Sequence, residues 1–264
     1  MTVSLDELPI AASRAWSRFR DETRRSLGGD LTALWGYGGT TFPDRSRRLG
    51  DLDTFAVVER VPDERTKRKL EQAEAEIARE HGIYWDIWYV LAADAGRSEP
   101  PPHALDPERR HTSWAIDCAH WRAGRYVSLS GRAPEGLVPA PTRPAIEAAL
   151  SGELEHLERH VEEGDDDPVE ATYAICNGSR ILYAIETGDV AISKRAGAMW
   201  ALERLPERWH EAIRAAARAY DAEARARDAE VLRETMAPFV AMVRQHLPLV
   251  DARGPGEPLR RSGY

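Results

Sequence analysis

Hydrophobic and polar residues follow two different periods along the chain, and the period changes near residue 145. Before that point, short runs of β-branched and aromatic residues are separated by glycine and proline, which is typical of strands joined by turns. After it, the apolar spacing is that of helices only. The pattern therefore predicts an α+β protein whose strands all lie in the first half of the chain.

The first half is expected to contain strands, helices and one proline-rich loop. Strands are predicted at residues 31–36, 51–58, 83–91 and 126–129, and helices at residues 5–27, 63–81 and 112–124. Residues 96–107, which include four prolines, are predicted to form a loop. Residues 83–91 (IYWDIWYVL) give the strongest strand pattern, because nearly every position is aromatic or β-branched.

The second half is expected to contain helices joined by short connections. Helices are predicted at residues 145–163, 168–187, 193–204 and 206–247, the last being two helices or a bent one. Residues 133–144 contain four prolines and are interpreted as the linker between two domains, residues 1–140 and 145–250. Residues 251–264, rich in glycine, proline and arginine, are predicted to be a disordered tail.

Composition narrows the class of protein. A length of 264 residues fits two domains. The formal net charge of −8 argues against a nucleic-acid-binding protein, which needs cationic groups to neutralise phosphates, and suits a cationic partner. The N-terminus does not resemble a secretory signal, and no apolar run is long enough for a membrane helix. Cys118 and Cys176 are interpreted as reduced, buried thiols of a cytoplasmic protein. A monomer is expected.

A glycine pair and an aspartate pair carry the candidate chemistry. Gly38 and Gly39 follow the first predicted strand, and Asp51 and Asp53 begin the second. Residues i and i+2 of a strand point to the same face, so the two carboxylates lie together and repel each other unless a cation lies between them. Such oxygen ligands suit Mg²⁺ with substrate phosphates, and a glycine turn suits phosphate oxygens. The alternative is a plain strand pair with solvated aspartates.

A third carboxylate interrupts the strongest predicted strand. Asp86 lies among aromatic residues, and a buried charge without a partner costs several kcal/mol. Asp86 is therefore expected either to face Asp51 and Asp53 across a metal site or to be a surface or ion-paired aspartate.

The segment from Tyr37 to Thr54 resembles the nucleotidyltransferase superfamily. In that superfamily an apolar residue and Gly-Gly or Gly-Ser are followed by a spacer and then by Asp-apolar-Asp-apolar, and here Thr54 takes the final apolar position. Residues 177–206 resemble the helical C-terminal domain of the streptomycin/spectinomycin adenylyltransferases, and residues 127–139 also resemble that family. The resemblance implies a nucleotidyltransferase domain with a small mixed sheet and flanking helices, followed by a helical bundle.

The resemblance also implies roles for individual residues. Asp51 and Asp53 fall on the metal-binding pair of the family. Asp86 falls on the third carboxylate, the presumed catalytic base, which is a Glu in the better-known members and so one methylene longer. Gly39 takes the place of a usual Ser. Arg180, Lys194 and Tyr220 fall on nucleotide-contacting positions, as do Gly38 and Gly39 of the phosphate turn. The alternative is that Arg180 and Lys194 are solvated helix charges and that Tyr220 is a core residue.

The segment that would bind the acceptor substrate is less similar to the family than the motifs above. The family draws acidic and tryptophan contacts from a segment that here is residues 156–170, which has no tryptophan but contains Asp166, Asp167 and Glu170. These three are the candidate substrate-binding residues, because an acidic cleft attracts polycations, although a solvated acidic loop would look the same. His156 and His160 share a helical face and are interpreted as a surface pair.

The function expected from the resemblance is transfer of AMP from ATP to a hydroxyl of an aminoglycoside, with release of pyrophosphate and resulting antibiotic resistance. Asp51, Asp53 and Asp86 would hold two Mg²⁺ ions, and Asp86 would accept the hydroxyl proton. Two alternatives stay open: another small-molecule or protein hydroxyl as acceptor, and a catalytically silent relative that binds nucleotide.

Overall fold

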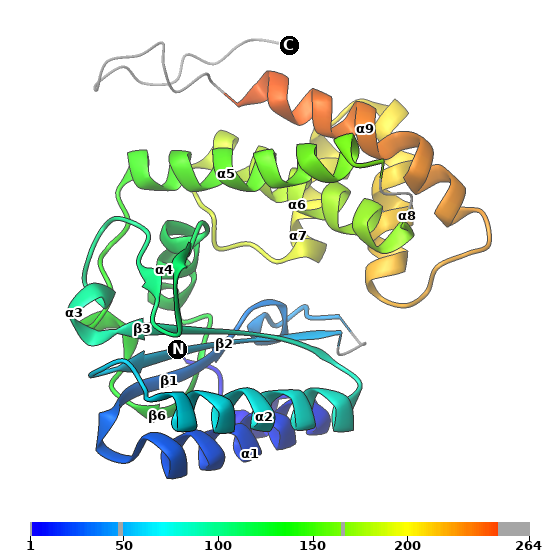
Figure 1. The fold of residues 1–264 in the computed structure, drawn as a ribbon. Coiled ribbons are helices and arrows are strands. Elements are labelled where there is room, and N and C mark those ends of the chain that lie inside the picture. Colours follow the sequence, from blue (N-terminus) through cyan, green and yellow to red (C-terminus); the bar gives the residue numbers. More distant parts are fainter. Residues whose placement is uncertain (1, 47–49, 165–166, 248–264) are drawn as a thin grey trace.

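The computed structural model describes residues 2–46, 50–164 and 167–247. A four-stranded sheet lies in the lower half of Figure 1, and helices from the second half of the chain lie above it. The predicted α+β class, with a small mixed sheet followed by a helical bundle, is confirmed. The predicted tail, residues 251–264, lies outside the described residues.

The sheet has the strand order β3-β2-β1-β6. Its strands are β1 (Leu31–Tyr37), β2 (Asp51–Val58), β3 (Tyr84–Leu91) and β6 (Val127–Gly131). β1 pairs antiparallel with β2 and with β6, whereas β2 and β3 are parallel. The parallel pair requires a crossover, which is α2 (Glu64–His81), capped at its start by the Asp63 side chain.

Helices cover both faces of the sheet. α1 (Ile10–Leu27) and α2 lie side by side against one face, where Trp16, Phe19 and Ile77 are completely buried (Figure 1). α4 (Trp114–Arg122) covers the other face and contributes Trp114 and Trp121 to an aromatic core. A short helix, α3 (Ala92–Ala95), follows β3. Burial of these large aromatic rings is the main source of stability in this half, because apolar area removed from water stabilises by about 25 cal/mol per Å².

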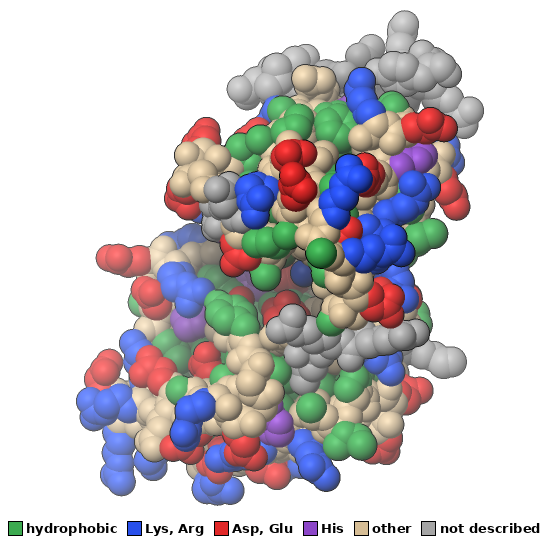
Figure 2. Space-filling view, turned by 90° about the vertical axis from the view of Figure 1, so that its right-hand side faces the viewer, with side chains coloured by type: hydrophobic (Ala, Val, Ile, Leu, Met, Phe, Trp, Pro, Cys, Tyr) green, Lys and Arg blue, Asp and Glu red, His purple; other side chains and the backbone are tan. Residues whose placement is uncertain are grey.

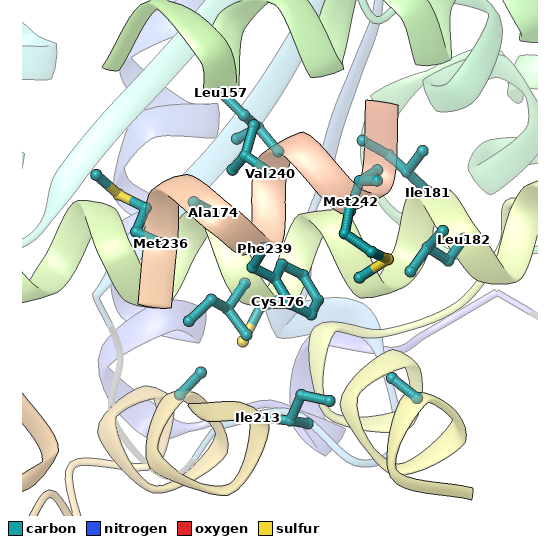
Figure 3. Close-up of a cluster of buried hydrophobic side chains, with 14 of the residues drawn as sticks. Leu157, Ala174, Cys176, Ile181, Leu182, Ile213, Met236, Phe239, Val240 and Met242 are labelled. Atoms are coloured by element: carbon teal, nitrogen blue, oxygen red, sulfur yellow. The ribbon is translucent and has the colours of Figure 1, made fainter. Parts of the chain in front are cut away.

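Five helices form the second half of the described chain. They are α5 (Arg143–Glu162), α6 (Pro168–Thr187), α7 (Lys194–Arg204), α8 (His210–Tyr220) and α9 (Asp228–His246). Figure 3 shows Phe239 of α9 beside Cys176 of α6 and Met242 of α9 beside Ile181 and Leu182 of α6. Val240 of α9 lies beside Leu157 of α5. Cys118 and Cys176 are both free and buried, as predicted. Among the described residues, no helix is long and apolar enough to cross a membrane.

Three element predictions need correction, and the choice left open for the last helix, two helices or a bent one, is resolved. α1 begins only at Ile10, because Pro9 disfavours helical geometry at Leu8 and leaves a separate 3-10 turn, Leu5–Glu7. The predicted loop at residues 96–107 contains the start of a small hairpin, β4 (Pro102–His103) and β5 (Asp106–Arg110). Pro144 belongs to the first turn of α5, where proline is tolerated, and not to the linker. The last predicted helix is two, α8 and α9, after a 3-10 turn, Glu207–Trp209.

The turn between α8 and α9 is held by one ion pair. Arg218 Nε and Nη2 donate to the two carboxylate oxygens of Asp228 at 2.9 and 2.5 Å, and the Arg225 backbone N–H donates to Asp228 at 2.8 Å. The Asp228 side chain is 5% exposed. These hydrogen bonds hold the pKa of Asp228 below its usual range.

We expect Asp228→Asn to lower the free energy of unfolding by about 1–3 kcal/mol, because Arg218 loses its charged partner. A group with a lowered pKa stabilises the fold above its unfolded-state pKa, and this contribution disappears as pH falls through the folded-state value. The difference between wild type and variant in urea denaturation should therefore be full at pH 7 and shrink in acid below pH ~4. Glu147→Gln, which removes the exposed Arg143–Glu147 pair, is the control and should change stability by less than about 0.5 kcal/mol. Equal effects of the two substitutions would contradict this assignment.

Candidate active site

The register of the sheet places three polar side chains in one row. Tyr37 on β1 pairs with Asp53 on β2, and Asp53 pairs with Asp86 on β3. Directly paired residues point to the same face of a sheet, so the two carboxylates are cross-strand neighbours. Asp51 pairs with Tyr84 and lies two residues before Asp53, so it shares this face at the end of the sheet. The three aspartates singled out by the sequence are thus brought together.

The neighbouring positions explain why these strands carry polar residues only at this end. The next row on the same face is aromatic and buried, formed by Trp35, Phe55 and Trp88. On the opposite face, the Thr54 hydroxyl accepts hydrogen bonds from the indole N–H groups of Trp16 and Trp85 at 3.0 and 2.8 Å. Thr54 therefore replaces an apolar residue because it satisfies two buried donors.

Gly38 forms the turn against which Asp53 lies. Its φ of +84° is a conformation that residues with a side chain rarely adopt, and an added Cβ would lie 1.7 Å from Asp53 Oδ2. A 3-10 turn, Gly39–Thr41, follows, with the Thr41 N–H bonded to the Gly38 carbonyl. At Gly39 an added Cβ would lie 3.0 Å from the Tyr220 hydroxyl. The missing side chain at this position therefore makes room for Tyr220.

The helices supply the cationic groups that face these carboxylates. Lys194, the first residue of α7, places Nζ 4.9 Å from the ring centroid of Tyr173 and 5.7 Å from that of Tyr220. Arg180 on α6 donates to Asn177 Oδ1 at 3.0 Å and lies 3.3 Å from His120 Nε2. Both cations are held in position by neighbours, which reduces the entropy that a bound anion must overcome.

Besides the Arg180–His120 contact, further hydrogen bonds tie the helical half to the sheet half at the site. Ser193 donates to Asp44 at 2.5 Å, Ser46 donates to the Tyr220 carbonyl at 2.7 Å, and His120 Nε2 lies 2.9 Å from the Val190 carbonyl. These contacts fix the distance between the two walls. They lie on segments that are separated by between 70 and 174 residues.

A cleft of about 1330 Å³ lies between the two halves. Figure 2 shows the hollow between the lower and upper parts of the molecule. Its lining includes Gly38, Gly39, Asp51, Asp53, Asp86, Arg180, Lys194 and Tyr220. The volume exceeds the ~300–1,000 Å³ typical of a site for one small molecule, so the cleft has room for two substrates.

The carboxylates of the cleft carry more negative charge than their protein neighbours neutralise. Burial and the charges of Asp51, Asp117 and Asp86 raise the pKa of Asp53 well above its usual range, and Lys194 opposes this only in part. Burial also raises the pKa of Asp86, against Arg109 and the Trp88 indole. Bound cations would relieve this repulsion. Among the described residues, however, no group of three or more His, Cys, Asp or Glu side chains is arranged to hold a metal ion by itself.

Comparisons with known proteins found a family model that matches the helical half and a solved structure with the same fold. Residues 137–246 match the family model described as aminoglycoside adenylyltransferase, C-terminal domain. The fold matches the solved structure of spectinomycin adenyltransferase AAD(9) from Enterococcus faecialis, determined with ATP and spectinomycin, with a TM-score of 0.73 and 18% sequence identity over 89% of this chain and 98% of that one. No curated protein matches the sequence of the chain.

The resemblance to the aminoglycoside adenylyltransferases is confirmed. The prediction of a nucleotidyltransferase enzyme is confirmed with it. The roles assigned to individual residues and the domain boundary near residue 140 stay predictions.

Of the predicted acceptor-binding residues that the structure describes, Glu170 lines the cleft and Asp167 does not. Glu170 lines the cleft and lies 3.8 Å from His160 Nδ1. Asp167 caps α6 by accepting the Val169 N–H at 2.9 Å and is not among the cleft-lining residues. Asp166 lies outside the described residues. His156 and His160 are half-buried and line the cleft, and their interpretation as a surface pair stays a prediction.

Several cleft residues were not found from the sequence. They are Tyr84, Arg109, His111, Asp117, Glu153 and Tyr173. Asp117 projects from α4, and the Tyr37 hydroxyl hydrogen-bonds to it. The only indication in the sequence was an aspartate within an otherwise apolar helix, which predicts a partner but not its identity.

We expect Gly38→Ala to reduce turnover at least ~100-fold, because the new methyl group must displace the Asp53 carboxylate and a displacement of about 1 Å can cost that much. Initial rates of pyrophosphate release and a thermal melt would measure both effects. The control is Gly152→Ala in α5, where no atom of the described residues lies within 4 Å of the added Cβ. It should leave turnover unchanged and stabilise the helix by up to ~1 kcal/mol. Full activity of Gly38→Ala would contradict the role given to this turn.

Proposed function

We propose that the protein transfers AMP from ATP to a hydroxyl of an aminoglycoside of the streptomycin/spectinomycin type, releasing pyrophosphate and thereby conferring resistance. The observation that carries the proposal is the cleft itself, with Asp51, Asp53 and Asp86 on the sheet wall and Arg180, Lys194 and Tyr220 on the helical wall. The family model matched by residues 137–246 and the shared fold support the same reaction.

The nucleotide would lie between the glycine turn and the two helical cations. Backbone N–H groups at Gly38 and Gly39 suit phosphate oxygens, and Arg180 and Lys194 would oppose the charge of the leaving pyrophosphate. Tyr220, already close to Gly39, would pack near the ribose or base. Positioning and electrostatics of this kind account for most of the catalysis of phosphoryl-group chemistry.

The carboxylates fit Mg²⁺ bound jointly with the nucleotide. Asp51 and Asp53 would each supply an oxygen and the triphosphate would supply the rest, which agrees with the absence of a complete ligand set among the described residues. Asp86 borders the same position, and the prediction of two ions held by all three aspartates stays a prediction. When bound, Mg²⁺ would neutralise phosphate charge and lower the pKa of the acceptor hydroxyl.

Asp86 would act as the base. The acceptor oxygen attacks the α-phosphorus as the bond to the bridging β-phosphate oxygen breaks, and the hydroxyl proton passes to Asp86. The raised pKa of Asp86 strengthens it as a proton acceptor, while Arg109 limits the rise. The cationic aminoglycoside would enter a cleft in a protein of net charge −8, which favours its approach. A cytoplasmic location and a monomeric state remain predictions.

The test is mass spectrometry of products after incubation with ATP, Mg²⁺ and either spectinomycin or streptomycin. Wild type should give an antibiotic heavier by one AMP unit. Asp53→Ala should lower the rate at least ~100-fold, and the exposed α1 variant Asp21→Ala should behave like wild type.

ATP binding without any adenylylated antibiotic would contradict the proposed acceptor. Protein or other small-molecule hydroxyls would then be tested, and the absence of AMP transfer to all of them would indicate a nucleotide-binding protein without catalytic activity.

A further inference from the structure

Asp117 is a cleft carboxylate to which the proposed reaction assigns no role. It lies on α4, its side chain is 14% exposed, and the Tyr37 hydroxyl hydrogen-bonds to it. Burial, Glu153 and Asp86 raise its pKa to about 8, and Arg180 opposes the rise. Asp117 therefore lies where the surrounding field favours an added positive charge.

Glu153 approaches the same part of the cleft from α5. The Tyr173 hydroxyl donates to Glu153 Oε1 at 2.9 Å, so this carboxylate, like Asp117, is held by one tyrosine. A carboxylate has about four acceptor positions, and a single tyrosine occupies one of them. Both side chains line the cleft, so further acceptor positions are available to a ligand.

A third group at this place points independently to a ligand. His111 is 3% exposed and lines the cleft, yet its Nε2 has no hydrogen-bond partner within the described part of the chain. Nε2 lies 3.5 Å from Asp117 Oδ2, which is too far for a good hydrogen bond. Burial lowers the pKa of His111 to about 3, so the ring is neutral at pH 7. Buried polar atoms without partners are rare in folded proteins, and a bound polar group is one explanation.

We propose that Asp117 and Glu153 bind an ammonium group of the acceptor, with His111 Nε2 hydrogen-bonding to a polar atom beside it. The proposal rests on the proposed function and specifies which part of the cleft selects a cationic acceptor. An alkylammonium has N–H donors that two carboxylates can share, and such charge-assisted bonds are about twice as strong as neutral ones. Its residues differ from the acceptor-binding candidates Asp166, Asp167 and Glu170 that the sequence analysis singled out.

The experiment must distinguish ammonium binding by Asp117 from an alternative role, in which Asp117 only positions Arg180. Arg180 is the cation that opposes the rise in the pKa of Asp117, so Asp117 could instead only hold Arg180 in place for the nucleotide. In that case its loss would weaken nucleotide binding. Loss of an ammonium-binding carboxylate would weaken acceptor binding and leave the nucleotide unaffected.

The experiment is titration calorimetry of the full chain with spectinomycin, which carries two amines, in saturating Mg²⁺ and α,β-methylene-ATP, an analogue that cannot transfer AMP. Asp117→Asn and Glu153→Gln should each raise the spectinomycin Kd about 10- to 100-fold, because each removes hydrogen bonds to a charged group. The Kd of the analogue should stay within about twofold of wild type. Glu155→Gln, an exposed position on the same helix as Glu153 and outside residues 156–170, should change neither value.

The other outcomes contradict either the subsite or the proposed function, and the two cases can be told apart. Unchanged spectinomycin binding in both variants would exclude the subsite, and equal weakening of spectinomycin and analogue would assign Asp117 to the support of Arg180. A wild-type protein that binds neither spectinomycin nor streptomycin would also overturn the subsite. Spectinomycin binding that depends on Asp117 and Glu153 without AMP transfer from ATP would contradict the proposed function alone and leave the subsite standing.

Discussion

The close contact between Asp53 and the turn at Gly38 is the constraint on which the site depends. The carboxylate occupies the space in which any side chain at position 38 would lie. The same aspartate pairs with Tyr37 on one side and Asp86 on the other, so the turn, both neighbouring strands and the catalytic row are fixed together. The buried Trp35, Phe55 and Trp88 in the next row hold the strands at this register. A shift of one residue would turn the carboxylates toward α1 and α2.

The second constraint is the balance of charge across the cleft. The sheet and α4 contribute carboxylates that raise one another's pKa, and the helices contribute Arg180 and Lys194. Burial is the largest cause of these raised pKa values, and Lys194 and Arg180 oppose the rise at Asp53 and Asp117 only in part, so cationic ligands would favour the ionised carboxylates. This arrangement favours substrates that arrive with metal ions or ammonium groups.

Sequence and structure agree where the information is local. The strands that carry Asp51, Asp53 and Asp86 follow from β-branched and aromatic runs, and α6 was predicted with the bounds that the structure shows, Pro168–Thr187. The resemblance singled out Arg180, Lys194 and Tyr220 from the sequence alone, and all three line the cleft. Asp117, His111 and Glu153 could not be found in this way, because their meeting depends on how α4 packs on the sheet and how α5 packs on α4. Asp167 shows the reverse case: its acidic neighbours suggested substrate binding, whereas its carboxylate caps a helix.

In the proposed reaction, the base at position 86 is an aspartate where the family usually has glutamate, which shortens its reach. Parallel pairing with β2 fixes the Asp86 backbone beside Asp53, and a side chain shorter by one methylene keeps its carboxylate closer to the sheet. Burial raises its pKa, while Arg109 on the β5 hairpin and the Trp88 indole restrain that rise. In the proposed reaction, the acceptor hydroxyl would therefore have to come deeper into the cleft to reach the Asp86 carboxylate. Asp117 and Glu153 line the same cleft, so an acceptor anchored there by an ammonium group has a physical reason to bind at that depth.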